Sequence, residues 1–246
     1  MLGLVVVLGL GACSTAAVRQ EEAQRLKSSE INTELGLSYL RKGDTDRALL
    51  KLTRALEQNP DNPKAHAAIA LVYDNLDRKE RARQHYARAV ELSPDDSYGL
   101  NAYGAFLCRE GAVDEALKYF ARAVDNPLYP QPEVALTNAG QCARSKNDLE
   151  QAETYFRAAL RRNATFAPAL YQMSRLSYET GRALSARGYL QRYLAVAKHT
   201  AQTLWLGIQI ERELGDRDTV ATYSLLLRRQ FPDSEEARLL LKSDPR

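Results

Sequence analysis

The sequence has few of the residues that interrupt or cross-link a helical chain. Its 246 residues include only 9 prolines, 13 glycines and 3 cysteines, and no stretch alternates apolar and polar residues as a strand would. The 34 basic and 31 acidic residues nearly balance and form no basic run with interleaved aromatics, which excludes a nucleic-acid stripe. With 45% hydrophobic and 26% charged residues, the composition is that of a water-soluble helical protein with one continuous core.

Signatures of catalysis and of metal binding are also missing. His66, His85 and His199 stand at unrelated positions, with no HExxH or Cys-x-x-Cys spacing, so we expect neither a metal site nor a cofactor. No Gly-x-Ser-x-Gly, phosphate-binding loop or dinucleotide fingerprint occurs. We therefore do not expect the chain to be an enzyme.

What the sequence does contain is a motif that returns every 34 residues. Two successive copies share a small residue, a tyrosine, an alanine, a large apolar residue, a second alanine and a proline: Gly36, Tyr39, Ala48, Leu52, Ala55 and Pro60, then Ala70, Tyr73, Ala82, Tyr86, Ala89 and Pro94. This period and these residues are the tetratricopeptide signature. Because one helical hairpin cannot bury its own apolar face, copies stack, and small residues let the helices approach closely.

The turn between the two helices of each copy carries the clearest marker. Residues that tolerate a left-handed backbone recur there: Gly43, Asp77, Gly111, Asn147, Gly181 and Gly215. Their one irregular step, 36 residues instead of 34, coincides with a proline-rich loop at 126–132. In the sixth copy, Gly207 stands one residue off register. The pattern predicts an all-α, right-handed superhelical solenoid of six tetratricopeptide helix-turn-helix repeats and a short C-terminal capping helix; an irregular helical domain is the alternative.

These markers also set the expected boundaries along the chain. We expect a lipoprotein signal peptide at residues 1–12 and a lipidated cysteine with a tether at 13–28. The six repeats should follow at 29–62, 63–96, 97–130, 133–166, 167–200 and 201–233, and a capping helix with a tail at 234–246.

The amino terminus differs from the rest of the chain. Residues 1–12 are uncharged and too few to span a membrane, which needs about 20, but they suit the apolar region of a secretory signal. Leu-Gly-Ala-Cys, ending at Cys13, looks like a bacterial lipobox, and Ser14 favours the periplasmic face of the outer membrane over retention at the inner one. No Lys or Arg precedes the apolar run, so either the true start lies upstream, which we favour, or the signal is weak. The alternative is an apolar helix that packs on the first repeat.

Once Cys13 is acylated, two cysteines remain in a compartment that permits disulfides. Cys108 and Cys142 fall on the first helices of the third and fourth repeats, which are neighbours in a tetratricopeptide stack. A disulfide requires Cα atoms within about 7 Å, which is tight for packed helices. We expect a bridge, with two buried thiols that pack as small apolar residues as the alternative.

In a solenoid of this kind, function is carried by the concave surface, which holds a segment of a partner. The first helices are expected to present the following residues there: Thr33, Leu37, Leu40, Arg41, Ala67, Leu71, Asp74, Asn75, Tyr98 and Asn101, continued by Arg109, Tyr171, Arg175 and Tyr178. Leu37, Leu40 and Leu71 would form an apolar strip that favours an amphipathic helix over a carboxylate-bearing peptide tail. The alternative is that these leucines belong to the core between helices.

Several segments are more specific than the repeat itself. They are the lipobox, Asn101-Ala-Tyr-Gly-Ala-Phe-Leu-Cys108, Pro127-Leu-Tyr-Pro130, Asn138-Ala-Gly-Gln-Cys142, and Leu204-Trp-Leu-Gly-Ile-Gln-Ile-Glu211 with Gly215-Asp-Arg-Asp218. With them the whole chain resembles the type IV pilus biogenesis and stability lipoproteins called PilF or PilW.

That resemblance implies a pilotin, an outer-membrane lipoprotein that helps the secretin PilQ reach the outer membrane and form its multimer. It further implies six repeats, a cysteine pair like those bridged in some members, and a role in pilus biogenesis and twitching motility. The expected partners are PilQ, other type IV pilus components and, through the lipid anchor, the membrane. We expect a monomer. The main alternative is a lipoprotein of the same architecture that scaffolds cell-wall enzymes, similar to NlpI.

Overall fold

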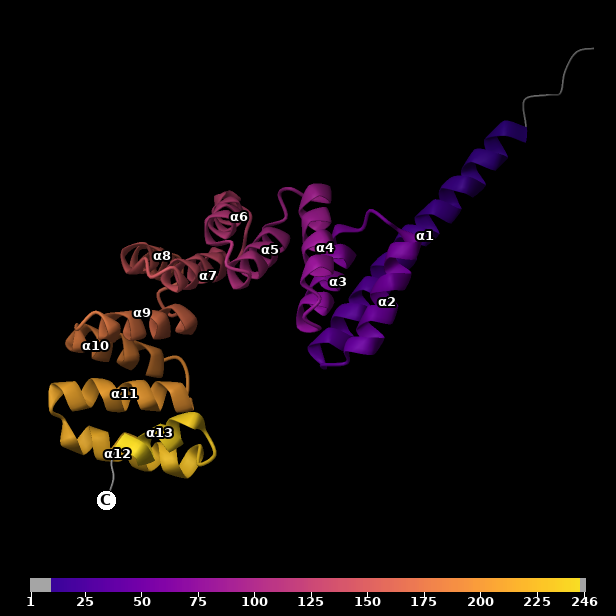
Figure 1. Ribbon diagram of the computed structural model, residues 1–246. Helices are drawn as coiled ribbons and strands as arrows, with labels where there is room; N and C mark the ends of the chain where they lie inside the picture. The colour runs from indigo at the N-terminus through magenta and orange to yellow at the C-terminus, as the bar shows by residue number, and fades with distance from the viewer. Residues whose placement is uncertain (1–9, 244–246) are drawn as a thin grey trace, which may run out of the picture. The chain divides into compact units, whose positions relative to one another are not determined.

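A computed structural model describes residues 10–243, with side chains from residue 16 onward. Within that range the chain forms thirteen α-helices and no strand (Figure 1). Their bounds are α1 (Leu10–Arg41), α2 (Thr45–Gln58), α3 (Pro63–Asn75), α4 (Lys79–Leu92), α5 (Ser97–Arg109), α6 (Val113–Asp125), α7 (Pro132–Ser145), α8 (Leu149–Arg162), α9 (Ala167–Glu179), α10 (Ala183–Leu194), α11 (Ala201–Leu214), α12 (Arg217–Gln230) and α13 (Glu235–Ser243).

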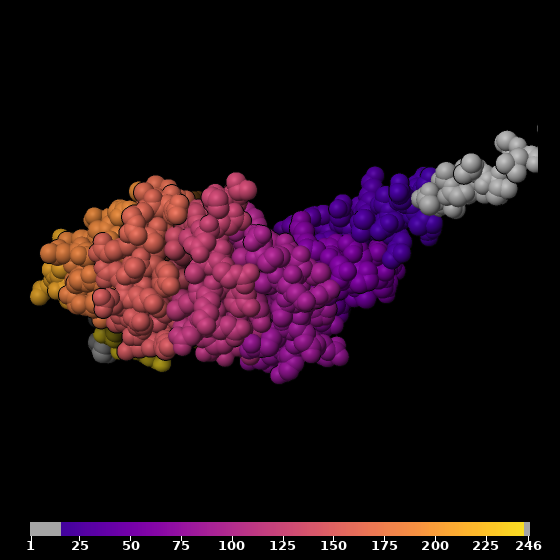
Figure 2. Space-filling view, turned by 90° about the horizontal axis from the view of Figure 1, so that it is seen from above, coloured from indigo at the N-terminus to yellow at the C-terminus, as the bar shows by residue number. Residues whose placement is uncertain are grey.

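The chain divides into two units, and each is described by itself. Unit 1 spans residues 1–110 and contains α1 to α5, whereas unit 2 spans residues 111–246 and contains α6 to α13. Consecutive helices pack as pairs: α1 with α2 and α3 with α4 in unit 1, and α7 with α8, α9 with α10 and α11 with α12 in unit 2. In unit 2 the colours follow one another as bands from magenta to yellow, so neighbours in sequence are neighbours in space (Figure 2). The predicted all-α tetratricopeptide fold is confirmed.

The six turn residues predicted from the sequence all adopt a positive φ. The values are 74° at Gly43, 53° at Asp77, 80° at Gly111, 63° at Asn147, 71° at Gly181 and 79° at Gly215. A left-handed residue ends a helix sharply because it turns the chain back, and its amide N–H bonds to a carbonyl of the preceding helical turn. At Gly215, for example, the N–H donates to the carbonyls of Arg212 and Glu211.

In the first five repeats, the second helix buries the predicted alanine and the large apolar residue four positions later. The alanines are fully buried, and the large residues are almost so: Ala48, Ala82, Ala116, Ala152 and Ala186, with Leu52, Tyr86, Phe120, Phe156 and Leu190. Gly140 lies so close to the ring of Phe156 that a Cβ there would be 2.4 Å from it. Burial of each large side chain contributes about 1.5–3 kcal/mol, and the small residue opposite is what permits the contact.

The register of the sixth repeat is resolved by its first helix. A Cβ at Gly207 would lie 2.7 Å from the ring of Tyr223, and these residues keep the sixteen-residue spacing that separates Gly140 from Phe156. Eight positions separate Gly207 from the turn residue Gly215, whereas seven separate Gly140 from Asn147, so the additional residue lies between Gly207 and the turn. The packing contact is therefore conserved in space, and the shift is absorbed at the end of the helix.

The stretch predicted as a tether is helical and belongs to α1, which has 32 residues. Alanines at positions 16 and 17, and Glu21 four residues before Arg25, favour a helix here, and residues 16–27 are exposed. Figure 1 shows α1 continuing past α2 as one helix. Fifteen helical residues extend about 22 Å, so the stretch is a spacer of defined length rather than a flexible coil. The predicted signal peptide, 1–12, lies outside the described residues except for its last three.

Candidate functional site

Unit 1 contains an apolar groove between its first helices. It has a volume of about 580 Å³ and is lined by residues of α1, α3, α4 and α5: Leu37, Pro63, Lys64, Ala67, Ala68, Leu71, Tyr86, Asp96, Tyr98, Gly99, Ala102, Ala105 and Arg109. We call it the α1–α5 groove.

The hollow arises because small side chains recur on the faces that α3 and α5 turn toward each other. Ala67, Ala102 and Ala105 leave space, whereas Leu71 and Tyr98 stand at the edge with 40% and 54% of their surfaces exposed. Large apolar side chains that remain exposed beside a hollow are typical of a surface that receives another apolar surface. The shape and composition suit the apolar face of a partner segment.

Ion pairs within unit 1 neutralise the two cations of the groove lining, Lys64 and Arg109, and the one acidic residue of the lining, Asp96, caps the first turn of α5. Lys64 Nζ lies 2.5 Å from Glu34 Oε1, which joins α3 to α1. Arg109 of α5 pairs with Asp74 of α3. Because each cation already has an acidic partner, the groove presents mainly apolar surface to a ligand.

The floor of the groove includes the phenol ring of Tyr86, which is almost completely buried. Its ring stacks with Tyr103 at 5.8 Å between centroids and packs at a tilt against Phe106 at 5.3 Å. Burial raises the pKa of the Tyr86 hydroxyl well above its ordinary value, so the floor is uncharged.

Five of the predicted groove residues line the α1–α5 groove: Leu37, Ala67, Leu71, Tyr98 and Arg109. Leu37 also packs against the core of the first two repeats, so it serves both surfaces. Sequence reasoning missed Ala102 and Ala105, although their three-residue spacing on a predicted first helix would have placed them on one face.

Thr33 does not line the groove, and the expectation for it is corrected. Its side chain is only 1% exposed. Its hydroxyl donates to the carbonyl of Ser29 at 2.8 Å and accepts from the side chain of Asn62 at 3.2 Å. Asn62 caps the first turn of α3, so Thr33 stabilises the connection between the first two repeats instead of facing a partner.

Leu40 is a second correction, because it packs against the buried cluster that contains Ala48 and Leu52. For this residue, the alternative that assigned the leucines to the core is the right one.

The other predicted positions fall around the groove. Asp74 is in the rim ion pair with Arg109. Arg41 and Asn75 are exposed at the ends of α1 and α3, and Asn101 is partly buried on α5, outside the groove lining.

A second hollow on unit 2, with a volume of about 360 Å³, continues the predicted set. It lies among α9, α11 and α13, and we call it the α9–α13 hollow. It is lined by Tyr171, Arg175, Tyr178, Glu179, Gln202, Trp205, Leu206, Gln209 and Glu236. The tyrosines and Arg175 were predicted. Glu179 and the residues of α11 and α13 were not.

Charged groups in this hollow are linked to the neighbouring repeat. Glu179 accepts from Arg175 Nε at 2.8 Å and from Arg144 Nη1 at 3.0 Å. Burial is the main reason why the pKa of Tyr171 is raised, and the carboxylates of Glu236 and Glu179 add to the rise. The hollow therefore combines aromatic rings with charged groups of both signs.

Two of the histidines that look unrelated along the chain meet between α3 and α4. His66 Nδ1 and His85 Nδ1 are 2.9 Å apart, and His66 Nε2 is 2.9 Å from the carbonyl oxygen of Pro60. Since that carbonyl can only accept, His66 donates from Nε2, and in the neutral imidazole its Nδ1 then accepts from His85. Burial is the first cause that lowers the pKa of His85, followed by the charges of His66 and Arg81. The pair ties α4 to the turn that precedes α3.

The remaining sequence expectations concern cysteine, metal and membrane. Cys108 lies on α5 in unit 1 and Cys142 is buried on α7 in unit 2, and their bridge stays a prediction. Cys13 falls within α1, but its side chain is outside the described side chains. No group of three or more His, Cys, Asp or Glu that could hold a metal occurs among the described residues. In the same part of the chain, no helix combines the length and apolar character needed to cross a membrane.

The stacked helical hairpins and the groove between their first helices define a tetratricopeptide repeat protein. The tetratricopeptide repeat family model matches residues 33–97, 80–133 and 107–168, so the chain belongs to this class. Members of the class are typically interaction scaffolds rather than enzymes.

Whole-chain comparisons narrow the assignment. The type IV pilus assembly protein PilF of Pseudomonas aeruginosa is 30% identical over 96% of this chain and 94% of its own length. The solved structure of Pseudomonas aeruginosa PilF matches with a TM-score of 0.79 and 30% identity, over 90% of this chain and 100% of that one. The crystal structure of PilW, a widely conserved type IV pilus biogenesis factor, matches with a TM-score of 0.80 and 31% identity, over 87% and 98%. The chain therefore belongs to the PilF/PilW family of tetratricopeptide repeat proteins of type IV pilus biogenesis.

Proposed function

We propose that this protein is a lipid-anchored pilotin that binds the type IV pilus secretin PilQ and promotes its outer-membrane localisation and multimerisation. Through the secretin it supports pilus biogenesis and twitching motility. Family membership supports the pilus assignment. The observation that carries the binding role is the α1–α5 groove, which is open and mainly apolar and whose two cations are already paired.

The groove acts by taking up the apolar face of a secretin segment. Leu71 and Tyr98 are exposed in the free protein and become buried in the complex. Burial of such side chains favours binding by about 25 cal/mol for each Å² removed from water. The alanines in the groove allow a helix with large apolar residues to approach closely.

The anchor is acylated Cys13, and the exposed amino-terminal half of α1 is the spacer. Acyl chains hold the protein at the periplasmic face of the outer membrane. A helical spacer of about 22 Å keeps the first repeats close to the membrane. The anchor thus raises the effective concentration of the groove near the secretin.

Replacement of Leu71 by Asp tests the groove. The variant places a charge in the apolar surface and should weaken binding of purified PilQ at least about tenfold, as measured by biolayer interferometry. The matched control is Leu50→Asp, because Leu50 is a similarly exposed leucine on α2 outside the groove. Secretin multimers should decrease in cells with Leu71→Asp and remain normal with Leu50→Asp. Equal binding by the two variants would exclude the groove.

Replacement of Cys13 by Ser tests the anchor. The folded protein should then leave the outer-membrane fraction, and PilQ should no longer reach the outer membrane as a multimer. If Cys13→Ser protein stays in the outer-membrane fraction after a carbonate wash, the lipid anchor is refuted.

We also propose a bridge between Cys108 and Cys142. In the loop-entropy model it would stabilise the fold by roughly 3–4 kcal/mol. A thiol assay on the denatured, unreduced protein should detect neither cysteine, and two reactive thiols would rule out the bridge.

A further inference from the structure

The α9–α13 hollow combines aromatic side chains with a carboxylate, which an apolar partner helix would leave unmatched. Three aromatic side chains, Tyr171, Tyr178 and Trp205, line it together with the carboxylate of Glu236. Each of these residues is partly buried. Aromatic faces carry negative quadrupole charge and attract cations, most strongly for tryptophan.

Among the described residues, one carboxylate that lines the hollow takes part in no ion pair. Glu179 is already paired with Arg175 and Arg144. Glu236 forms no ion pair with any described residue. Its position in the first turn of α13 favours a negative charge but supplies no cation. The partly buried carboxylate of Glu236, next to aromatic rings, is therefore the group in the hollow that can pair with a cation of a ligand.

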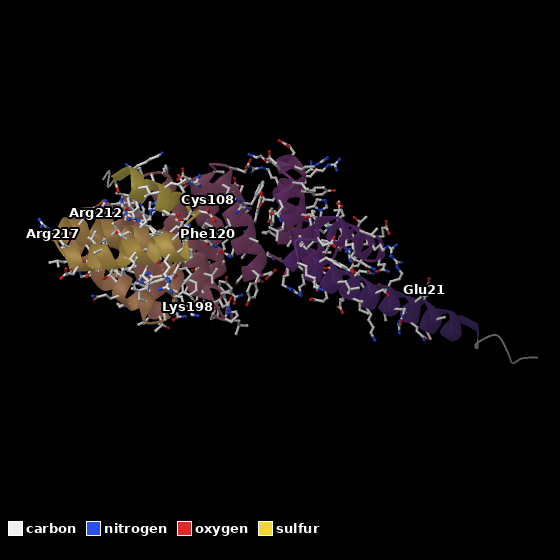
Figure 3. The ribbon with its side chains drawn as sticks, turned by 90° about the horizontal axis from the view of Figure 1, so that it is seen from below. Glu21, Cys108, Phe120, Lys198, Arg212 and Arg217 are labelled. Carbon is white, nitrogen blue, oxygen red and sulfur yellow. The ribbon has the colours of Figure 1, made fainter. Side chains whose placement is uncertain are left out.

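The same tryptophan already contacts a guanidinium from outside the hollow. The Arg212 guanidinium carbon lies 6.0 Å from the centroid of Trp205, and its Nη1 donates to the hydroxyl of Ser243 at 3.1 Å. Figure 3 labels Arg212 among the helices of unit 2. Arg212 is not among the residues that line the hollow, so the hollow itself stays open to a ligand.

We propose that the α9–α13 hollow binds an arginine side chain of a partner segment, with the guanidinium against Trp205 and Tyr171 and paired to Glu236. A planar guanidinium fits because it stacks on aromatic rings and pairs with a carboxylate at the same time. The inference rests on the proposed function in one respect, namely that the first helices of the repeats receive a partner chain. It adds that the partner presents a basic residue to unit 2.

The chain has a single tryptophan, and it lines this hollow, so binding can be followed directly. The full chain, purified in a mild detergent, is titrated with the peptide acetyl-Ala-Ala-Arg-Ala-Ala-amide while tryptophan emission is recorded. The emission should change and saturate, with a Kd on the order of 1 mM for so small a ligand. The same peptide with Gln in place of Arg should give no saturable change.

Two pairs of variants separate this role from a structural one. Glu236→Gln should weaken the arginine peptide about tenfold, whereas Glu235→Gln, on the same turn and exposed, should bind like the unmodified protein. Tyr171→Phe keeps the aromatic face and should retain binding, whereas Tyr171→Leu should lose it. Circular dichroism checks that each variant is folded.

The inference is overturned if the Gln peptide binds as well as the Arg peptide, or if Glu236→Gln and Tyr171→Leu, both folded, bind it normally. The proposed function has an independent readout, because Leu71→Asp reports on PilQ binding at the α1–α5 groove. Loss of PilQ binding in that variant, together with normal peptide binding by Glu236→Gln, would remove the arginine site and leave the proposed function in place.

Discussion

The α1–α5 groove and the α9–α13 hollow are formed by the same type of first helix, yet their chemistry differs. The groove is lined by alanines with Leu71 and Tyr98 at its edge, and its two cations are paired. The hollow is lined by three aromatic rings and by Glu236, whose carboxylate forms no ion pair within the described part of the chain. The repeat geometry fixes where a first helix lies, whereas the residues on its free face set what it binds. One family of repeats can therefore present an apolar and a cation-binding surface on the same chain.

The largest effect on the free energy of unfolding is expected from glycines that lie against a large side chain of the partner helix, because that side chain differs between the two units. In unit 2, Gly140 faces the rigid ring of Phe156, and in unit 1, Gly36 faces the branched side chain of Leu52, with Cγ as the nearest atom. Gly140→Ala should lower the free energy of unfolding by about 3 kcal/mol and Gly36→Ala by about 2 kcal/mol, because a leucine side chain has more torsional freedom to shift than a planar ring. Urea unfolding followed by circular dichroism measures both.

The control for these variants is Gly188→Ala, since a Cβ at Gly188 would meet no atom within 4 Å. It should be neutral or stabilise by up to about 1 kcal/mol through helix propensity. A larger loss for Gly36→Ala than for Gly140→Ala would contradict the assignment of the tighter seam to unit 2.

The next effect concerns two ion pairs that differ in exposure, Glu153–Arg182 in unit 2 and Glu34–Lys64 at the rim of the groove. Glu153 is 21% exposed and accepts from Arg182, whose hydrogen bond is the main cause of its lowered pKa. Glu153→Gln should lower the free energy of unfolding by about 2 kcal/mol. Glu34→Gln should change it by less than about 0.5 kcal/mol, because Glu34 and Lys64 are 58% and 63% exposed.

The contribution of Glu153 also has a defined pH dependence. A carboxyl whose pKa is lowered in the folded protein stabilises the fold above its ordinary pKa and loses that contribution as the pH falls. Chemical unfolding at pH 7 and pH 3 should therefore show a smaller difference between Glu153→Gln and the unmodified protein at the lower pH. An unchanged difference would show that the carboxylate charge is not what stabilises this seam.

Salt should weaken binding at the two surfaces to different extents, and this difference should be smaller than the effects above. Apolar contacts are little affected by screening, so PilQ binding that depends on Leu71 should change by no more than about twofold between 50 and 500 mM NaCl. Arginine-peptide binding at the α9–α13 hollow should weaken about fivefold over the same range, because it relies on the Glu236 charge. Equal salt dependence of the two equilibria would erase the distinction between the surfaces.

The smallest effect is expected from the histidines. The pKa of His85 in unit 1 is lowered by burial and by nearby His66 and Arg81, and that of His199 in unit 2 is lowered by burial. The unfolded chain takes up protons near pH 6.5 while the folded chain resists, so stability is lost as the pH falls below that value. Thermal midpoints at pH 7.5 and 5.0 should fall less in His85→Gln than in the unmodified protein. A fall of the same size would mean that the His66–His85 pair does not contribute.

The architecture followed from sequence because each repeat encodes its own hairpin. Gly43 and Asp77 mark turns that form locally, and Ala48 and Leu52 mark a seam between adjacent helices. The spacer in α1 was harder to predict, because a polar, exposed stretch can be coil or helix and only continuity with the first repeat decides between them.

The binding surfaces were predicted less completely than the fold. Thr33 and Leu71 both fall on first helices, yet Thr33 is buried in a hydrogen-bond network with Asn62 whereas Leu71 edges the groove. The face of a helix that remains free depends on where the next helix crosses it, and that crossing is set by side chains from other repeats. The meeting of His66 and His85 depends on the same kind of long-range packing.

By itself, the sequence determined a periodic stack of helical hairpins, the places where the chain turns, and the small residues that let neighbouring helices touch. Tertiary structure alone decided which leucines are core and which are surface, how Trp205 and Glu236 come to share one hollow, and where two histidines meet. The physical reason is range: backbone turns and hairpin seams are encoded by neighbouring residues, whereas exposure at a given position depends on every helix packed around it.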